Sequence, residues 1–200
     1  MAMTFNHEDE YLLADERVSL RPLQANDDAF LLPFALHEPD TWKYSQISAA
    51  GKQGMADYIN SALTAKATGK EYPFIVYDKQ TKTYAGSTRF YDIQLQNQTL
   101  QLGYTWYGEK FRGTGLNKHC KFLLLKFAFE GLDMKRVEFR ADARNSRSIA
   151  AMKSIGCIAE GIIRSTMPLP DGTRRDSIIL SILKSEWENG VKDKLYRQLK

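Results

Sequence analysis

The sequence contains little of what disulfide-linked or metal-binding proteins use. Its cysteines are Cys120 and Cys157, which form no Cys-x-x-Cys pair, so neither a disulfide framework nor a zinc-binding cysteine cluster is indicated. The three histidines, His7, His37 and His119, show no metal-ligand spacing. We therefore expect no metal ion, a reducing compartment, and cysteines that fill apolar space.

Long apolar runs are also missing. No segment approaches the length of a membrane span, and residues 1–16 carry acidic side chains where a signal peptide has basic and apolar ones. The formal net charge of +4 is modest, and basic residues are mixed with acidic ones, so nucleic acid is not an expected partner. These absences favour a cytoplasmic protein without membrane contact.

The remaining pattern fits one globular domain, because 200 residues with 43% hydrophobic content suffice for a sizeable core. We expect a flexible acidic segment over residues 1–16 and a single domain over 17–200. Alternation and turn signals predict strands at 17–22, 72–77, 84–95, 99–107, 135–142, 162–168 and 175–183. The last two flank Leu169-Pro170-Asp171-Gly172 and should pair as a hairpin. Helical signals predict helices at 27–36, 55–67, 116–130, 146–155 and 186–200. This order predicts an α/β (α+β) protein whose mixed sheet carries helices on both faces.

A glycine loop joins the strand at 99–107 to the next helix, and it reads Lys110-Phe111-Arg112-Gly113-Thr114-Gly115. The two glycines permit backbone conformations in which several N–H groups converge at a helix N-terminus, where the helix dipole also favours an anion. In the helix, an apolar stripe should face the sheet while the lysines face elsewhere: Leu116, Cys120, Leu123, Leu124 and Phe127 against Lys118, Lys121 and Lys126. The loop therefore predicts a pyrophosphate site.

Two common phosphate loops do not match. A Walker A loop needs Lys and then Ser or Thr after its second glycine, but Leu116 and Asn117 follow Gly115. A dinucleotide fingerprint needs a small residue where Lys118 stands. Nucleoside triphosphates and NAD are therefore disfavoured, and a plain glycine-rich turn stays open as the alternative.

The loop resembles the Gln/Arg-x-x-Gly-x-Gly/Ala motif with which GCN5-related N-acetyltransferases (GNAT) hold acetyl-CoA. A second landmark is similar to the RimJ/RimL-like branch of that family: Asn145, Ser148, Gly156-Cys157 and Glu160-Gly161. The resemblance implies a GNAT fold with a mostly antiparallel sheet of about seven strands. It also implies acetyl-CoA as co-substrate, with contacts to Tyr104, Trp106, Lys110, Phe111, Arg112, Gly113, Thr114, Gly115, Leu116, Asn117, Asn145 and Ser148.

The resemblance further implies catalytic roles. Glu160 matches a glutamate that serves as general base, although it also suits a structural hydrogen bond at a strand start. Ser148 matches a residue that protonates the departing thiolate, but Ser148 and Asn145 also suit helix capping. Many relatives have a tyrosine as general acid where this chain has Met152, which cannot donate a proton. The segment at 104–107 matches the splayed strand that stabilises the thioester oxygen.

The resulting hypothesis is an N-acetyltransferase acting on a primary amine, such as a protein N-terminal α-amine, by direct attack in a ternary complex. The alternatives are an acyl-CoA-binding module with little catalysis, and an enzyme for a small-molecule amine such as a polyamine, an amino acid or an antibiotic. The acceptor pocket is expected near the first helices, where aromatic residues could form its walls: Trp42, Tyr44, Tyr58 and Tyr91. A homodimer through a sheet edge or the last helix stays open.

Overall fold

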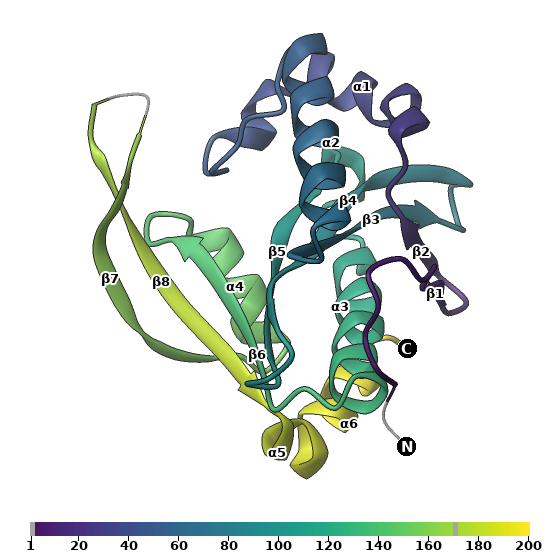
Figure 1. Ribbon diagram of the computed structural model, residues 1–200, viewed down its shortest axis with the longest axis vertical. Coiled ribbons are helices and arrows are strands. Elements are labelled where there is room, and N and C mark those ends of the chain that lie inside the picture. The colour runs from purple at the N-terminus through teal and green to yellow at the C-terminus, as the bar shows by residue number, and fades with distance from the viewer. Residues whose placement is uncertain (1–2, 170–171) are drawn as a thin grey trace.

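The computed structural model describes residues 3–169 and 172–200. They form one eight-stranded sheet with the order β1-β2-β3-β4-β5-β6-β8-β7 (Figure 1). Only the β5–β6 pair is parallel, and the other neighbouring described strands are antiparallel. The strands are β1 (Leu13–Ala14), β2 (Val18–Pro22), β3 (Glu71–Asp78), β4 (Thr83–Gln94), β5 (Thr99–Tyr107), β6 (Arg136–Asp142), β7 (Ile158–Pro168) and β8 (Arg174–Leu183). The predicted mixed sheet is confirmed, and β1 is the strand that the sequence did not predict.

Helices cover both faces of the sheet, as expected. Along β3, Phe74 and Val76 belong to one apolar core and Ile75 to the other, because successive side chains of a strand point to opposite faces. Helices α1 and α2 pack on the Ile75 face, and α3 packs on the opposite face. The helices are α1 (Asp28–His37), α2 (Gly51–Ala67), α3 (Leu116–Lys126), α4 (Ser146–Ser154), α5 (Lys184–Glu186) and α6 (Lys192–Arg197). None of the helices in the described ranges is long and apolar enough to cross a bilayer.

The N-terminal segment differs from its expected form. Phe5 and Tyr11 are each 8% exposed and belong to the core on the α3 face. The Tyr11 N–H donates to the Tyr72 hydroxyl at 3.1 Å, and the Met3 N–H donates to the Gly131 carbonyl at 2.8 Å. Residues 3–16 therefore pack on the domain, because the aromatic side chains between the acidic ones supply enough apolar surface to hold the segment.

The C-terminal region carries two further differences. The helix expected over 186–200 is interrupted at Gly190, whose φ of 133° is not helical, and Trp187 before it is buried at 1% exposure. The hairpin of β7 and β8 is confirmed, and β7 begins at Ile158 rather than at residue 162. Two residues of its predicted turn, Pro170 and Asp171, lie outside the described residues. In Figure 1 the hairpin extends away from the helices that cover β3 and β4.

Candidate active site

The glycine loop has the geometry of an anion cradle. Gly113 and Gly115 have φ values of 76° and 87°, and a Cβ built on either would meet nothing within 4 Å. The loop is fixed from within, since the Thr114 hydroxyl donates to the Phe111 carbonyl at 2.8 Å. Positive φ favours glycine at both positions, and the space above them is open to a ligand that approaches the backbone.

The main-chain amides of this loop also favour an anion-binding site. In the part of the chain that the structure describes, no main-chain N–H from residue 113 to residue 117 donates to a protein acceptor. These groups belong to the loop and the first turn of α3, where the helix itself offers no acceptors and the helix dipole favours negative charge. A phosphate ester fits this arrangement.

The second part of the site is a gap between β5 and β6. The two strands pair only from Thr99 to Gln101 on β5 and from Arg136 to Glu138 on β6, and they separate beyond that point. On its other side, β5 contains a bulge opposite Thr88, where the pairing with β4 shifts and Tyr104 takes a φ of 49°. The bulge bends β5 away from β6 and leaves a free strand edge along the gap.

A cavity of about 960 Å³ fills this gap and reaches both faces of the sheet. On the α3 face its walls are the glycine loop, the start of α4 and β6. On the α2 face its walls are aromatic side chains and the loop before α2. Residues from both walls include Gly113, Thr114, Asn117, Phe139, Asn145, Ser148, Met152, Trp42, Tyr44, Tyr58, Tyr91 and Tyr104. The four aromatic residues predicted for the acceptor wall therefore all line the cavity.

Ten of the twelve residues predicted to bind the cofactor also line the cavity, and two do not. Lys110 is exposed and lies with its ammonium 4.8 Å from the Phe111 ring centre. Leu116 is fully buried in the core. The reason is helical geometry, because residue 116 is the first helical residue on the stripe that packs against the sheet.

Two lining residues predicted to bind the cofactor, Arg112 and Asn145, also form hydrogen bonds that hold the site together. Arg112 donates to the Tyr107 carbonyl at 3.0 Å and to the Thr41 hydroxyl at 2.6 Å, so it ties the loop to the segment before α2. The Asn145 side chain accepts a hydrogen bond from the Ser148 N–H at 3.0 Å and caps α4. Asn145 therefore caps the N-terminus of α4, as the alternative reading of this residue predicted. Ser148 is the third residue of α4 and is not its cap.

Glu160 lies outside the cavity wall. Its carboxylate accepts from Arg136 at 2.5 Å and from the Ser181 hydroxyl, at the end of the sheet where β5 and β6 are still paired. The hydrogen bond from Arg136, with a smaller contribution from Ser181, lowers the pKa of Glu160. A carboxylate with a lowered pKa is a poor proton acceptor, so the geometry favours the structural alternative over the general base.

We expect Glu160→Gln to keep kcat within about threefold of the unchanged enzyme, because general acid or base groups contribute roughly 100-fold or more. The measurement is steady-state thiol release at saturating acetyl-CoA, with circular dichroism to verify folding. A fall in kcat of that size in a folded variant would restore Glu160 as the base.

Among the lining residues that the sequence did not predict are two buried basic ones, Lys121 and Arg175. Lys121 was expected to face away from the apolar stripe of α3, but it is 5% exposed and donates to the Thr105 hydroxyl at 2.7 Å. The cause is that α3 is buried around most of its circumference. A signal was present, because residues 119–129 contain only two lysines among mostly apolar neighbours. Arg175 on β8 is 4% exposed and donates to the Tyr44 carbonyl at 3.3 Å, which joins the hairpin to the aromatic wall.

Both cysteines are buried, as expected. Burial is the largest cause that raises the pKa of Cys120 to about 12 and that of Cys157 to about 12. Each is therefore a protonated thiol at neutral pH and offers no thiolate to an acyl group.

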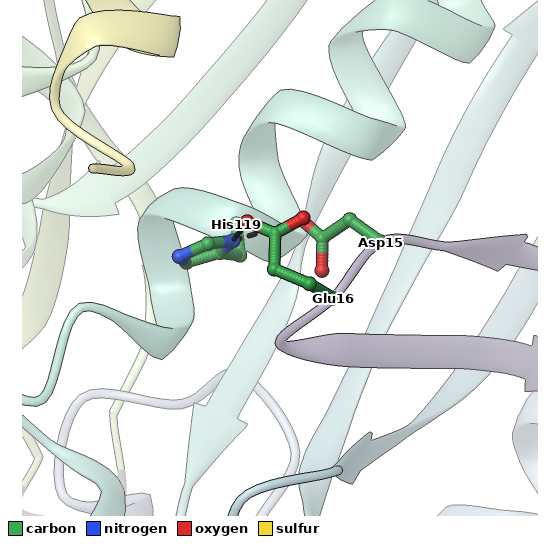
Figure 2. A group of neighbouring side chains, drawn as sticks. All are labelled: Asp15, Glu16 and His119. Carbon is green, nitrogen blue, oxygen red and sulfur yellow. Dashed lines mark hydrogen bonds and ion pairs between the residues drawn. The ribbon is translucent and has the colours of Figure 1, made fainter.

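His119 on α3 does not line the cavity. Its ring is hydrogen-bonded to Asp15, as Figure 2 shows. Its Nδ1 is 2.8 Å from Asp15 Oδ2 and 4.0 Å from Glu16 Oε1. The ligand atoms of the three residues lie within 4.8 Å of one another. However, Asp15 Oδ1 already accepts the N–H groups of Arg17 and Val18 at 2.8 Å. The cluster therefore fastens the turn between β1 and β2 to α3.

The fold and the site define an enzyme that takes an acyl group from a coenzyme A thioester. Residues 17–158 match the family model described as acetyltransferase (GNAT) domain, and the chain belongs to this family of GCN5-related N-acetyltransferases. It is an acyl-CoA-dependent acetyltransferase, as its sequence predicted.

Similar proteins agree with this assignment. A Bacillus subtilis (strain 168) protein with the provisional name ribosomal N-acetyltransferase YdaF is 31% identical over 103 residues, which are 52% of this chain and 55% of that protein. A solved structure from T. thermophilus, provisionally named an acetyltransferase, is 30% identical with a TM-score of 0.81 and covers 94% of this chain and 97% of its own. Mycobacterium smegmatis RimJ in complex with CoA-disulfide is 18% identical with a TM-score of 0.76, covers 94% and 93%, and shares the fold. The family model and these relatives confirm the expected GNAT membership.

Proposed function

We propose that this enzyme transfers the acetyl group of acetyl-CoA to the α-amino group of a protein N-terminus, by direct attack while both substrates are bound. The observation that carries the proposal is the continuous cavity, which joins the glycine loop on one face of the sheet to an aromatic wall on the other. Two substrates can thus approach one gap from opposite faces. Acetyl-CoA supplies the activated acetyl thioester.

The residues of the loop fit the diphosphate of coenzyme A. The open space above Gly113 and Gly115 admits a phosphate, and the unpaired amides up to Asn117 supply donors. Asn117, Lys118 and Ser148 line the adjacent wall. We infer that the pantetheine arm follows the free edge of β5, since an extended chain with amide groups can use the strand edge left open beyond Gln101.

The free edge also suits the charge that forms during the reaction. When an amine attacks the thioester, negative charge develops on the carbonyl oxygen, and preorganised N–H groups stabilise it best. Main-chain amides at the bulge of β5, around Tyr104, have no β6 partner. We assign this role to the main chain of the bulge rather than to a side chain.

Direct attack is favoured because neither cysteine lines the cavity. Both thiols have a pKa of about 12 and are buried, so an acyl-cysteine intermediate lacks its thiolate. The acceptor amine must itself be neutral to attack. An α-amine, with a pKa of about 7.7 to 8.0, meets this requirement far more readily than a lysine amine near about 10.4.

The names of similar proteins support a protein acceptor. The Bacillus subtilis relative is provisionally named a ribosomal N-acetyltransferase, and the Mycobacterium smegmatis RimJ structure shows a CoA derivative bound to this fold. In this chain, an aromatic wall of Trp42, Tyr44 and Tyr58 stands where the acceptor would lie. Aromatic rings can contact both an apolar side chain and a protonated amine before it loses its proton.

Three acceptors of matched concentration test the proposal: a peptide with a free N-terminus and acetylated lysines, the same peptide with a blocked N-terminus and free lysines, and spermidine. We expect the first to react fastest, because at neutral pH its amine is neutral in roughly 200- to 400-fold greater proportion than that of lysine. Thiol release gives the rate, and mass spectrometry locates the acetyl group. A faster reaction with spermidine or with the lysine peptide would contradict the proposal.

A further inference from the structure

Lys121 is a buried charged residue that the proposed transfer does not yet use. It stands on α3, and its ammonium lies 2.7 Å from the Thr105 hydroxyl on β5 and 5.8 Å from the centre of the Phe139 ring on β6. Thr105 belongs to the bulge and shares a hydrogen bond of 2.7 Å with Thr88. The Lys121 side chain therefore ends between the two separating strands, in the wall of the cavity.

The surroundings of Lys121 contain no compensating carboxylate among its described hydrogen-bond and ion-pair partners. Burial is the main cause that lowers its pKa to about 8, and the charged or titratable groups that act on it are the thiols of Cys120 on α3 and Cys157 before β7. A buried lysine without an anion is costly to keep in a protein core. Such a group indicates a functional role when it stands in a cleft.

The reaction needs a proton donor on this face of the sheet. Breaking the bond between the carbonyl carbon and sulfur leaves a thiolate, and a free thiol has a pKa of about 8.5. The tyrosine that many relatives use for this step is replaced by Met152, which lines the cavity but has no proton to give. Ser148 offers a hydroxyl, whose proton is far less acidic than that of an ammonium.

We propose that Lys121 is the general acid, which donates a proton from its ammonium to the departing coenzyme A thiolate. This inference rests on the proposed acetyl transfer. The acceptor nitrogen forms a bond to the acetyl carbon, the carbon–sulfur bond breaks, and sulfur keeps the electron pair and takes the proton from Nζ. The acceptor nitrogen releases its surplus proton to solvent, and Lys121 regains one from solvent. The products are the amide, the free thiol and the original ammonium.

The first test needs no acceptor amine. The thiol of bound CoA is titrated by the ultraviolet absorbance of its thiolate in the unchanged protein and in Lys121→Met. A nearby ammonium favours the thiolate, so we expect the pKa of the bound thiol to rise by about 1 unit or more in the variant. Lys126→Met, on an exposed position of the same helix, should leave it unchanged. An equal thiol pKa in Lys121→Met and the unchanged protein would overturn the inference.

The second test measures turnover. We expect Lys121→Met to lose about 100-fold or more in kcat. Its thermal stability should be equal or higher, because an apolar side chain replaces a buried charge. The unchanged enzyme should lose kcat above pH about 8, as Lys121 loses its proton, and the variant should not show this decline. Retained kcat in Lys121→Met would overturn the inference.

Lys121→Arg separates proton transfer from charge alone. Arginine keeps the positive charge but does not release a proton near neutral pH. We expect this variant to restore the pKa of the bound thiol without restoring kcat, and full recovery of kcat would overturn the assignment as general acid. The thiol titration involves no acceptor. If the acceptor is not a protein N-terminus, the proposed function is wrong, but the titration still tests the role of Lys121. Loss of CoA binding in the unchanged protein would refute both.

Discussion

Gly113→Val is expected to weaken acetyl-CoA binding by roughly 10- to 100-fold, which corresponds to the loss of a charge-assisted hydrogen bond or two between main-chain amides and phosphate. The branched side chain would occupy the open space above the loop and strain a backbone whose φ is 76°. Isothermal titration calorimetry with acetyl-CoA measures the effect directly. An unchanged dissociation constant would refute the phosphate assignment of the loop.

Gly51→Val is the matched control for this experiment. Gly51 has a φ of 74°, a Cβ there would also meet nothing within 4 Å, and the residue does not line the cavity. Its substitution therefore carries the same backbone strain without a ligand above it. Equal losses of unfolding free energy in the two variants, with a loss of affinity only in Gly113→Val, would show that the loop contacts the cofactor.

The parts of the site that the sequence predicted are those set by local chain geometry. Gly113 and Gly115 require positive φ, and the strand over Thr99–Tyr107 ends where its alternation stops, so neighbouring residues alone indicate a loop at a helix N-terminus. The family resemblance then implied the mixed, mostly antiparallel sheet that the structure shows. Local signals of this kind are strong because few backbone conformations satisfy them.

The parts that the sequence did not predict depend on tertiary packing. The periodicity of α3 placed Lys121 off the apolar stripe, yet its side chain is buried in the gap between β5 and β6, beside Thr105 and Phe139. Glu160 matched a family motif, but its carboxylate bonds to Arg136 on β6 and Ser181 on β8 and does not reach the cleft. Neither arrangement can be read from residues within one element, because each depends on which distant element lies next to it.

A buried ion pair packs against the bulge of β5, which separates β5 from β6. Arg89 on β4 is 1% exposed and donates to Glu71 on β3 at 2.6 Å. Its guanidinium lies 4.2 Å from the ring centre of Tyr104 and 4.7 Å from that of Tyr58. The arginine thus packs directly against the residue whose positive φ defines the bulge, and its charge is balanced by one carboxylate.

Glu71→Ala is therefore expected to lower the free energy of unfolding by about 3 kcal/mol, at the low end of the range for breaking a buried pair, because water reaches the 18% exposed Glu71 side chain. The loss arises mainly from the Arg89 charge left buried without a partner. Chemical denaturation of the purified variant measures it. The double variant Glu71→Ala/Arg89→Met should recover most of the loss, since removing the charge removes the penalty. If Glu71→Ala is as stable as the unchanged protein, Arg89 finds another partner. If the double variant is no more stable than Glu71→Ala, Arg89 contributes through its packing around Tyr104 and not through its charge.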